Sequence, residues 1–151
     1  MSEALNRSIE VHTCRQQHVV IRFILTDMPL AEPIDAKETS KLLNRLCNIL
    51  ERHLKLEDQV LYPELMRSHD AQMRETAIRY QHDMGGLRAA VETFCVRWSN
   101  ANAIAEDPQL FLYEWSVIRD LLLQRIEAED CDLYEHAQAH YDEAMRRATL
   151  D

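Results

Sequence analysis

The sequence predicts an all-α protein, an up-down-up-down bundle of four helices, and three observations support this prediction. The 151 residues include only two glycines, too few for the turns of an all-β domain of this length. Apolar residues recur at helical spacing in four long blocks. Short segments that contain helix breakers separate the blocks, which is typical of neighbouring antiparallel helices.

The first two blocks form one predicted hairpin. The first helix is expected over about residues 4–27 and ends before the two prolines of segment 26–35. Its inward stripe, at a and d spacing with a histidine at the centre, is Val11, Cys14, His18, Ile21 and Leu25. Asp35 begins the second helix and with Glu38 matches a capping box. This helix should present His53 and Glu57 on its apolar face, and Pro63 should kink or weaken its end.

The last two blocks form a second predicted hairpin. The third helix is expected over about residues 71–100, after an Asp70 N-cap, with Ile78, His82 and Gly86 on one face. A loop over 102–108 ends in Asp107-Pro108, an N-cap followed by proline at the first helical position. The fourth helix is expected over about 109–148. With no linker or shift in composition, residues 1–151 are expected to form one domain.

Composition excludes several classes of partner. The net charge of −9 argues against nucleic acid, which needs a basic face. Nowhere do eighteen apolar residues occur in a row, no basic run suits anionic lipid, and the N-terminus lacks a signal-peptide core. We therefore expect a cytoplasmic protein. In that compartment the widely spaced Cys14, Cys47, Cys95 and Cys131 are expected to be reduced and mostly buried.

An internal repeat relates the two hairpins. Residues 53–62, HLKLEDQVLY, align without a gap with residues 125–134, RIEAEDCDLY. Both segments place Glu-Asp four residues after a basic or imidazole residue, and Leu-Tyr four positions later. A histidine on the preceding helix, His18 or His82, comes before each segment. Each hairpin therefore offers one histidine and one helix with a glutamate at i+4.

This pattern suits metal binding. Residues i and i+4 lie on one helix face about a turn apart, close enough to reach the same ion. A histidine and a glutamate that face a bundle interior are each costly to bury unpaired. Imidazole and carboxylate together suit iron, manganese or zinc, and helical bundles hold two irons with such residues. We therefore predict an inward-facing metal site.

These residues resemble the hemerythrin-like family in its His-His-Glu cation-binding form, over essentially the whole chain. The segment Leu61-Tyr62-Pro63 is similar to the family as well. The resemblance implies a bundle that holds non-haem iron, with His18, His53 and His82 as terminal ligands and Glu57 and Glu129 as bridging carboxylates. Asp130 is a rival to Glu129, because the oxygen carriers of the family use an aspartate five residues after the fourth-helix histidine. The symmetry with Glu57 favours Glu129.

Two positions depart from the family pattern. Arg125 stands where the fourth-helix histidine is expected, and Gly86 stands where the oxygen carriers have a second third-helix histidine. A guanidinium has no lone pair for a metal, but its hydrogen bonds to Glu129 or Glu57 would put a positive charge at the second cation position. Whether the chain holds two irons, one or none therefore stays open. The Gly85-Gly86 pair is interpreted either as room beside His82 for a metal, a gas or Arg125, or as close helix approach.

Three hypotheses for function follow. The first is a non-haem iron protein that binds or senses O2, NO, or iron and redox state, with a small diatomic gas as its partner. The alternative is a metal-free regulatory module with a protein partner, in which Arg125 replaces the cation. An enzymatic role, such as peroxide or nitric oxide reduction, is the least favoured. Separately, His136 and His140 have the i, i+4 spacing of zinc ligands but are interpreted as a pair at the surface or helix end, outside the main site.

Overall fold

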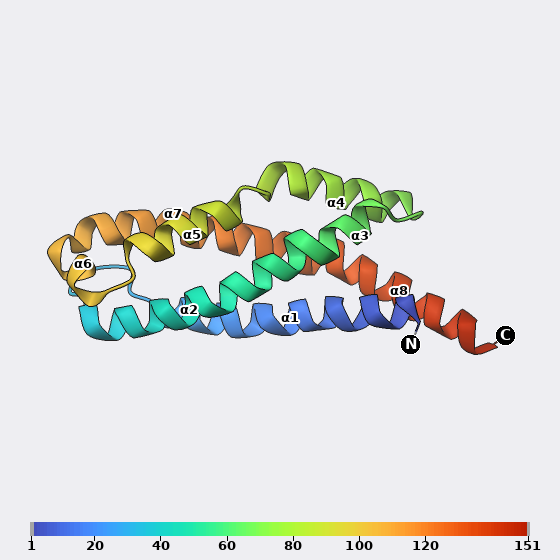
Figure 1. Cartoon of the computed structure of the whole chain (residues 1–151), viewed down its shortest axis with the longest axis horizontal. Helices are drawn as coiled ribbons and strands as arrows, with labels where there is room; N and C mark the ends of the chain where they lie inside the picture. Colours follow the sequence, from blue (N-terminus) through green and yellow to red (C-terminus); the bar gives the residue numbers. More distant parts are fainter. Residues whose placement is uncertain (1, 151) are drawn as a thin grey trace.

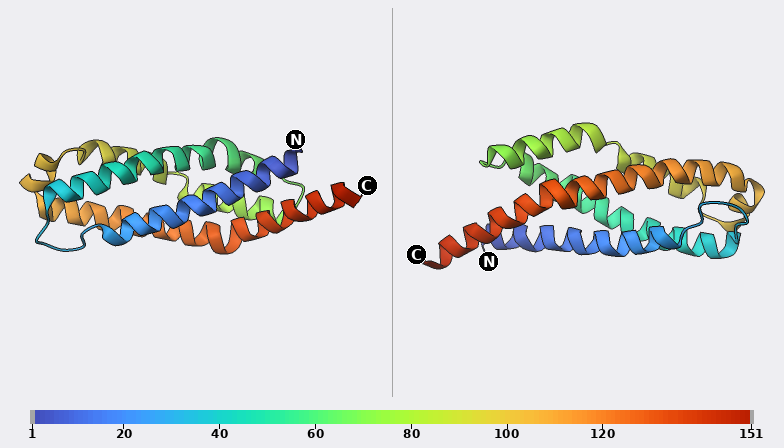
Figure 2. Two further views of the ribbon diagram at one scale, coloured as in Figure 1. Left: turned by 90° about the horizontal axis from the view of Figure 1, so that it is seen from below. Right: turned by 180° about the vertical axis from the view of Figure 1, so that it is seen from behind.

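A computed structural model describes residues 2–150, and its helices form four long arms that alternate in direction (Figure 1). The all-α bundle is thus confirmed, and Figure 2 shows both ends of the chain at the same end of the bundle. The elements are α1 (Glu3–Asp27), α2 (Ala36–Leu56), η1 (Glu57–Leu61), α3 (Tyr62–Met66), α4 (Ala71–Met84), α5 (Leu87–Arg97), α6 (Ala101–Glu106), α7 (Pro108–Ala128), η2 (Glu129–Leu133) and α8 (Tyr134–Leu150).

Three predicted N-caps are confirmed. The side chains of Asp35, Asp70 and Asp107 each accept a hydrogen bond from the backbone N–H three residues later, at 3.1, 3.0 and 3.1 Å. These bonds satisfy first-turn amides that have no partner within the helix. The second half of the expected capping box does not form, because the Glu38 carboxylate contacts Lys41 Nζ at 3.2 Å instead.

The third arm differs from its prediction. It breaks at residues 85 and 86 into α4 and α5, and the expected loop over 102–108 contains helix α6. The predicted inward face of this arm was also wrong, since Ile78 is 49 % exposed. A competing stripe at spacings of three, four and seven is buried instead, comprising Met73, Ala77, Tyr80, Leu87, Val91, Phe94 and Trp98. Burying this larger apolar surface turns Ile78 and His82 toward solvent.

Two short π-helical segments interrupt the second and fourth arms. Each begins at a repeat glutamate, Glu57 or Glu129, whose carbonyl accepts from the backbone N–H of the tyrosine five residues later. The wider turn brings residues i and i+5 closer to one face than a regular α-helix does. The expected irregularity near Pro63 takes this form in η1, but η2 has the same geometry without a proline.

The apolar core consists of two clusters along the bundle axis. One cluster joins the C-terminal half of α1 to α2, α5 and α7, and the other joins the N-terminal half of α1 to α3, α4 and α8. Polar residues separate the two clusters on three arms. On α1, for example, His18 lies between Cys14 of one cluster and Ile21 of the other. The polar residues of the repeat therefore meet in the middle of the bundle, closed off by apolar side chains at both ends.

A disulfide links Cys47 on α2 to Cys95 on α5, so the prediction of four reduced cysteines was wrong for this pair. The two residues are 48 positions apart, and only the packing of their helices brings their Cα atoms to 6.1 Å. Cys14 is a buried thiol and Cys131 an exposed one. Among residues 2–150, no helix is long and apolar enough to cross a membrane.

Candidate metal centre

Four buried side chains from four segments converge between the two core clusters. His18 comes from α1, His53 from α2, Glu57 from the start of η1 and Glu129 from the start of η2. Each offers a ligand atom, and these four atoms all lie within 4.8 Å of one another. The structure thus brings together four of the five predicted ligand residues.

The distances within this cluster are short. The Nε2 atoms of His18 and His53 are 2.9 Å apart. His53 Nε2 lies 3.0 Å from Glu57 Oε1, and His18 Nε2 lies 3.3 Å from Glu129 Oε1. Two imidazole nitrogens and two carboxylate oxygens therefore surround one small volume.

The outer nitrogens of both imidazoles are held by hydrogen bonds. His18 Nδ1 lies 2.7 Å from Asp130 Oδ1, and His53 Nδ1 lies 2.7 Å from Gln17 Oε1. Because both partners are acceptors, each Nδ1 carries the proton and donates it. The Nε2 lone pairs then point into the cluster, which is how metal-binding histidines are commonly oriented.

Such a cluster needs a cation. Two Nε2 lone pairs at 2.9 Å would repel unless a proton or metal ion lay between them. Burial disfavours the charged imidazole, but the neighbouring carboxylates of Asp130, Glu129 and Glu57 outweigh it and raise the pKa of His18 to about 11. Glu129 Oε1 is buried and has no hydrogen-bond partner among residues 2–150. The donor set and the orphaned oxygen both fit a metal cation. In the metal-free chain, a proton on His18 supplies the positive charge instead.

The repeat tyrosines bind the far oxygens of these glutamates in a crossed arrangement. Tyr62 O–H donates to Glu129 Oε2 at 2.8 Å, and Tyr134 O–H donates to Glu57 Oε2. Each tyrosine thus serves the glutamate of the other hairpin. The Leu-Tyr part of the repeat is the sequence signal for this role, but spacing alone does not show which carboxylate each tyrosine binds.

Arg125 lies beside the cluster and is 3 % exposed. Its Nε donates to Glu129 Oε2 at 3.1 Å, and its Nη2 donates to Asp58 Oδ1 at 2.7 Å and to Glu57 Oε1 at 3.4 Å. Its Nη1 reaches the carbonyl of Met84 at 3.4 Å, where α4 ends before the Gly85-Gly86 break. The guanidinium therefore places a fixed positive charge next to both glutamates.

The two glutamates respond differently to this environment. Burial works against ionisation of Glu57, but the neighbouring His53, His18 and Arg125 hold its pKa well below the ordinary value. Burial and the negative charge of Glu57 raise the pKa of Glu129. Two carboxylates that are buried so close together do not ionise equally, and Glu129 is the one that holds a proton more readily.

His82 and Gly86 lie apart from the cluster. The His82 side chain is 87 % exposed, and its Nδ1 lies 3.1 Å from the Asp83 carboxylate. A Cβ added at Gly86 would meet nothing within 4 Å, so the structure gives no close helix approach there. At this break, where α4 ends, Arg125 Nη1 lies 3.4 Å from the Met84 carbonyl.

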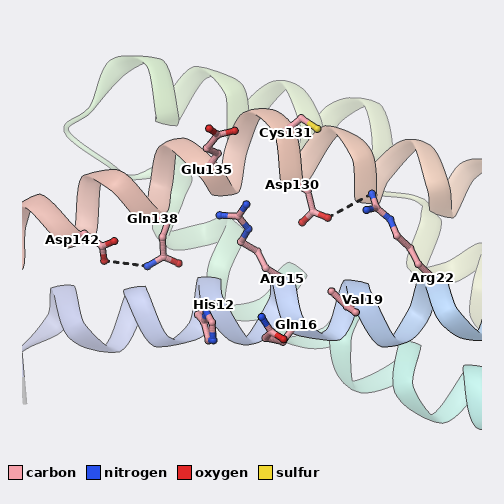
Figure 3. A pocket seen from close by; sticks show the side chains of 10 residues that line it. All are labelled: His12, Arg15, Gln16, Val19, Arg22, Asp130, Cys131, Glu135, Gln138 and Asp142. Carbon is pink, nitrogen blue, oxygen red and sulfur yellow. Dashed lines mark hydrogen bonds and ion pairs between the residues drawn. The ribbon is translucent and has the colours of Figure 1, made fainter.

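Asp130 connects the cluster to a surface groove. Its carboxylate is 19 % exposed, faces His18 on one side and lies 3.6 Å from Arg22 on the other. It lines a groove of about 710 Å³, and Figure 3 shows the residues of this groove between α1 and the fourth arm. As the structure places them, Glu129 faces the shared volume, while Asp130 holds His18 from outside.

A helical bundle with buried histidines and carboxylates around a cation position is the architecture of a metal-binding four-helix protein. The family model of the hemerythrin HHE cation-binding domain matches residues 10–137, and the chain belongs to this family. No curated protein and no solved structure matches the chain.

Proposed function

We propose that this chain is a non-haem iron-binding protein that holds one ion between His18, His53, Glu57 and Glu129 and senses a small diatomic gas or the redox state. The observation that carries this proposal is the convergence of four ligand atoms within 4.8 Å. Two histidines with carboxylates are a ligand set that suits non-haem iron. When bound, iron would supply an open coordination position for a gas and a one-electron redox couple.

The position of Arg125 supports one ion in place of two. Arg125 stands where the hemerythrin-like pattern has a fourth-helix histidine, and its charge lies at the expected position of the second cation. Its guanidinium and the two tyrosine hydroxyls occupy carboxylate oxygens that would otherwise bridge to a second ion. A positive charge beside these glutamates also repels a second cation.

A small cavity lies beside the cluster. It measures about 10 Å³, and its apolar walls include Ile21, Leu50, Leu122 and Ile126. That space is about what one water-sized molecule requires. His53, Arg125 and both glutamates line its polar side, so the cavity lies directly against the residues proposed to hold iron.

The second candidate is a metal-free regulatory module. It is favoured by the fact that Arg125 and a proton on His18 already neutralise the buried carboxylates. In that case the cluster would stabilise the bundle, and a protein partner would supply the function.

Metal analysis of the purified chain separates the two. With iron in the growth medium, we expect about one iron per chain by elemental analysis, and background levels in the His53→Ala/Glu57→Ala variant. His82→Ala is the matched control and should keep its iron, because that imidazole is exposed, contacts Asp83 and is not one of the four clustered ligands. A folded wild-type chain without metal would overturn the first proposal in favour of the second. For Arg125→His we expect more iron per chain than in the wild type.

A further inference from the structure

A second group of histidines lies on the surface, where α8 passes the turn between α3 and α4. His136 and His140 are one helical turn apart on α8, and Asp70 is the N-cap of α4. The exposed fractions of the side chains are 30 % for His136, 39 % for His140 and 26 % for Asp70, so ions from solvent can reach them. His136 is seven residues after Glu129, about 10 Å along the helix at the ordinary rise, and this group is therefore separate from the buried centre.

Both imidazoles face the same carboxylate oxygen. Asp70 Oδ1 accepts from the backbone N–H of Met73 at 3.0 Å, and this cap fixes the orientation of the carboxylate. Its other oxygen, Oδ2, lies 3.0 Å from His136 Nε2 and 3.7 Å from His140 Nδ1. The Met73 amide and the His136 hydrogen bond lower the pKa of Asp70, so the carboxylate stays charged.

One hydrogen bond from His136 would satisfy Asp70 Oδ2. A simple His136–Asp70 pair therefore does not require a second imidazole beside this oxygen. The position of His140 beside the same oxygen gives two imidazole nitrogens and one carboxylate, a common ligand set for zinc. The three ligand atoms are less tightly gathered than those of the buried centre. Rotation of the half-exposed His140 ring would bring its nitrogen to a shared ion.

We propose that Asp70, His136 and His140 form a surface site for a zinc-like divalent ion, which fastens α8 to the turn between α3 and α4. Water would complete the coordination, because the site opens to solvent. The site does not depend on the function proposed for the buried centre. Its affinity should fall in acid, because an imidazole must be deprotonated to bind a metal ion.

The test is a Zn²⁺ titration of the full-length chain, followed by calorimetry and by NMR of the histidine ring nitrogens. We expect saturable binding with shifts of the His136 and His140 ring signals, and at least about tenfold weaker binding in His140→Ala. His82→Ala is the matched control, an exposed histidine beside an aspartate on another helix, and should bind as the wild type does. Equal affinity in His140→Ala, or ring shifts confined to His18 and His53, would overturn the proposal.

A second variant separates this site from the buried one. In His53→Ala/Glu57→Ala the surface residues are intact, and the shifts of His136 and His140 should persist. Should that variant not fold, as judged by circular dichroism, the ring signals of the wild-type chain still assign bound zinc to one pair of histidines or the other. Loss of iron from the buried centre together with surface zinc binding would leave this proposal standing.

Discussion

Replacing Arg125 by methionine removes the guanidinium while keeping most of the side-chain volume. The change leaves Glu57 and Glu129 buried without their positive partner, along with the less buried Asp58. Breaking a buried ion pair by removing one partner costs about 3–5 kcal/mol, because the remaining charge stays desolvated. For a chain of this size, about 2–4 °C of melting temperature corresponds to each kcal/mol. We therefore expect Tm to fall by about 6–20 °C.

The stability lost when Arg125 is replaced should depend on pH, and the pKa of Glu129 determines the direction of this dependence. Burial and Glu57 raise the pKa of Glu129 in the wild type, and Arg125 opposes that rise. A carboxyl whose pKa is raised by folding contributes stability that is present below its unfolded pKa and is lost as pH rises through its folded pKa. Without Arg125 the folded pKa rises further, so the variant should lose more stability at pH 7.5 than at pH 5.

The assay is urea unfolding of metal-free protein at both pH values, followed by circular dichroism. Arg67→Met is the control, since its ion pair with Glu64 lies at the surface, where such pairs contribute less than about 1 kcal/mol. A loss below about 1 kcal/mol for Arg125→Met, or an equal loss at both pH values, would refute the role assigned to this arginine.

Three further predictions concern His18, Tyr134 and the disulfide. Because folding raises the pKa of His18 to about 11, its contribution to stability is present below pH 6.5 and lost as pH rises toward 11. Urea unfolding of the metal-free chain should therefore show falling stability from pH 7 to 10, and a flat profile would contradict this. Tyr134→Phe should cost about 1–3 kcal/mol in the same assay, because Glu57 loses a buried donor; an unchanged unfolding midpoint would exclude that role. Reduction of the Cys47–Cys95 bond should lower stability by about 4 kcal/mol, given its 48-residue separation, and a Cys47→Ser/Cys95→Ser variant should not respond to reductant.

The sequence predicted most of the fold because its local signals agree. The stripe around His18, the three aspartate caps and the proline-rich break all indicate helix starts, stops and faces without reference to distant residues. The buried face of the third arm was harder to predict, because two sets of helically spaced residues compete to face the core. The repeat suggested the face with His82, whereas the larger set of apolar side chains decides which face is buried.

The candidate site was predictable where spacing along one helix determines it. His53 and Glu57 share a helix face, and the repeat predicts the matching position of Glu129. The contacts of Arg125 with Asp58 and Met84, by contrast, depend on the packing of separate arms and on a helix break. The disulfide was missed for the same reason, since partners 48 residues apart leave no local pattern.

The crossed tyrosines make the two halves of the chain dependent on each other. Neither hairpin alone can supply hydroxyl donors to its own buried glutamate, because Tyr62 belongs to one half and its acceptor Glu129 to the other. In a fragment of either half, the glutamate would be exposed to solvent or buried without its hydroxyl donor. We therefore expect the two halves to fold only together. Two separately expressed hairpins should therefore associate with each other. A substitution of the tyrosine in one repeat should change the hydrogen bonding of the glutamate in the other repeat.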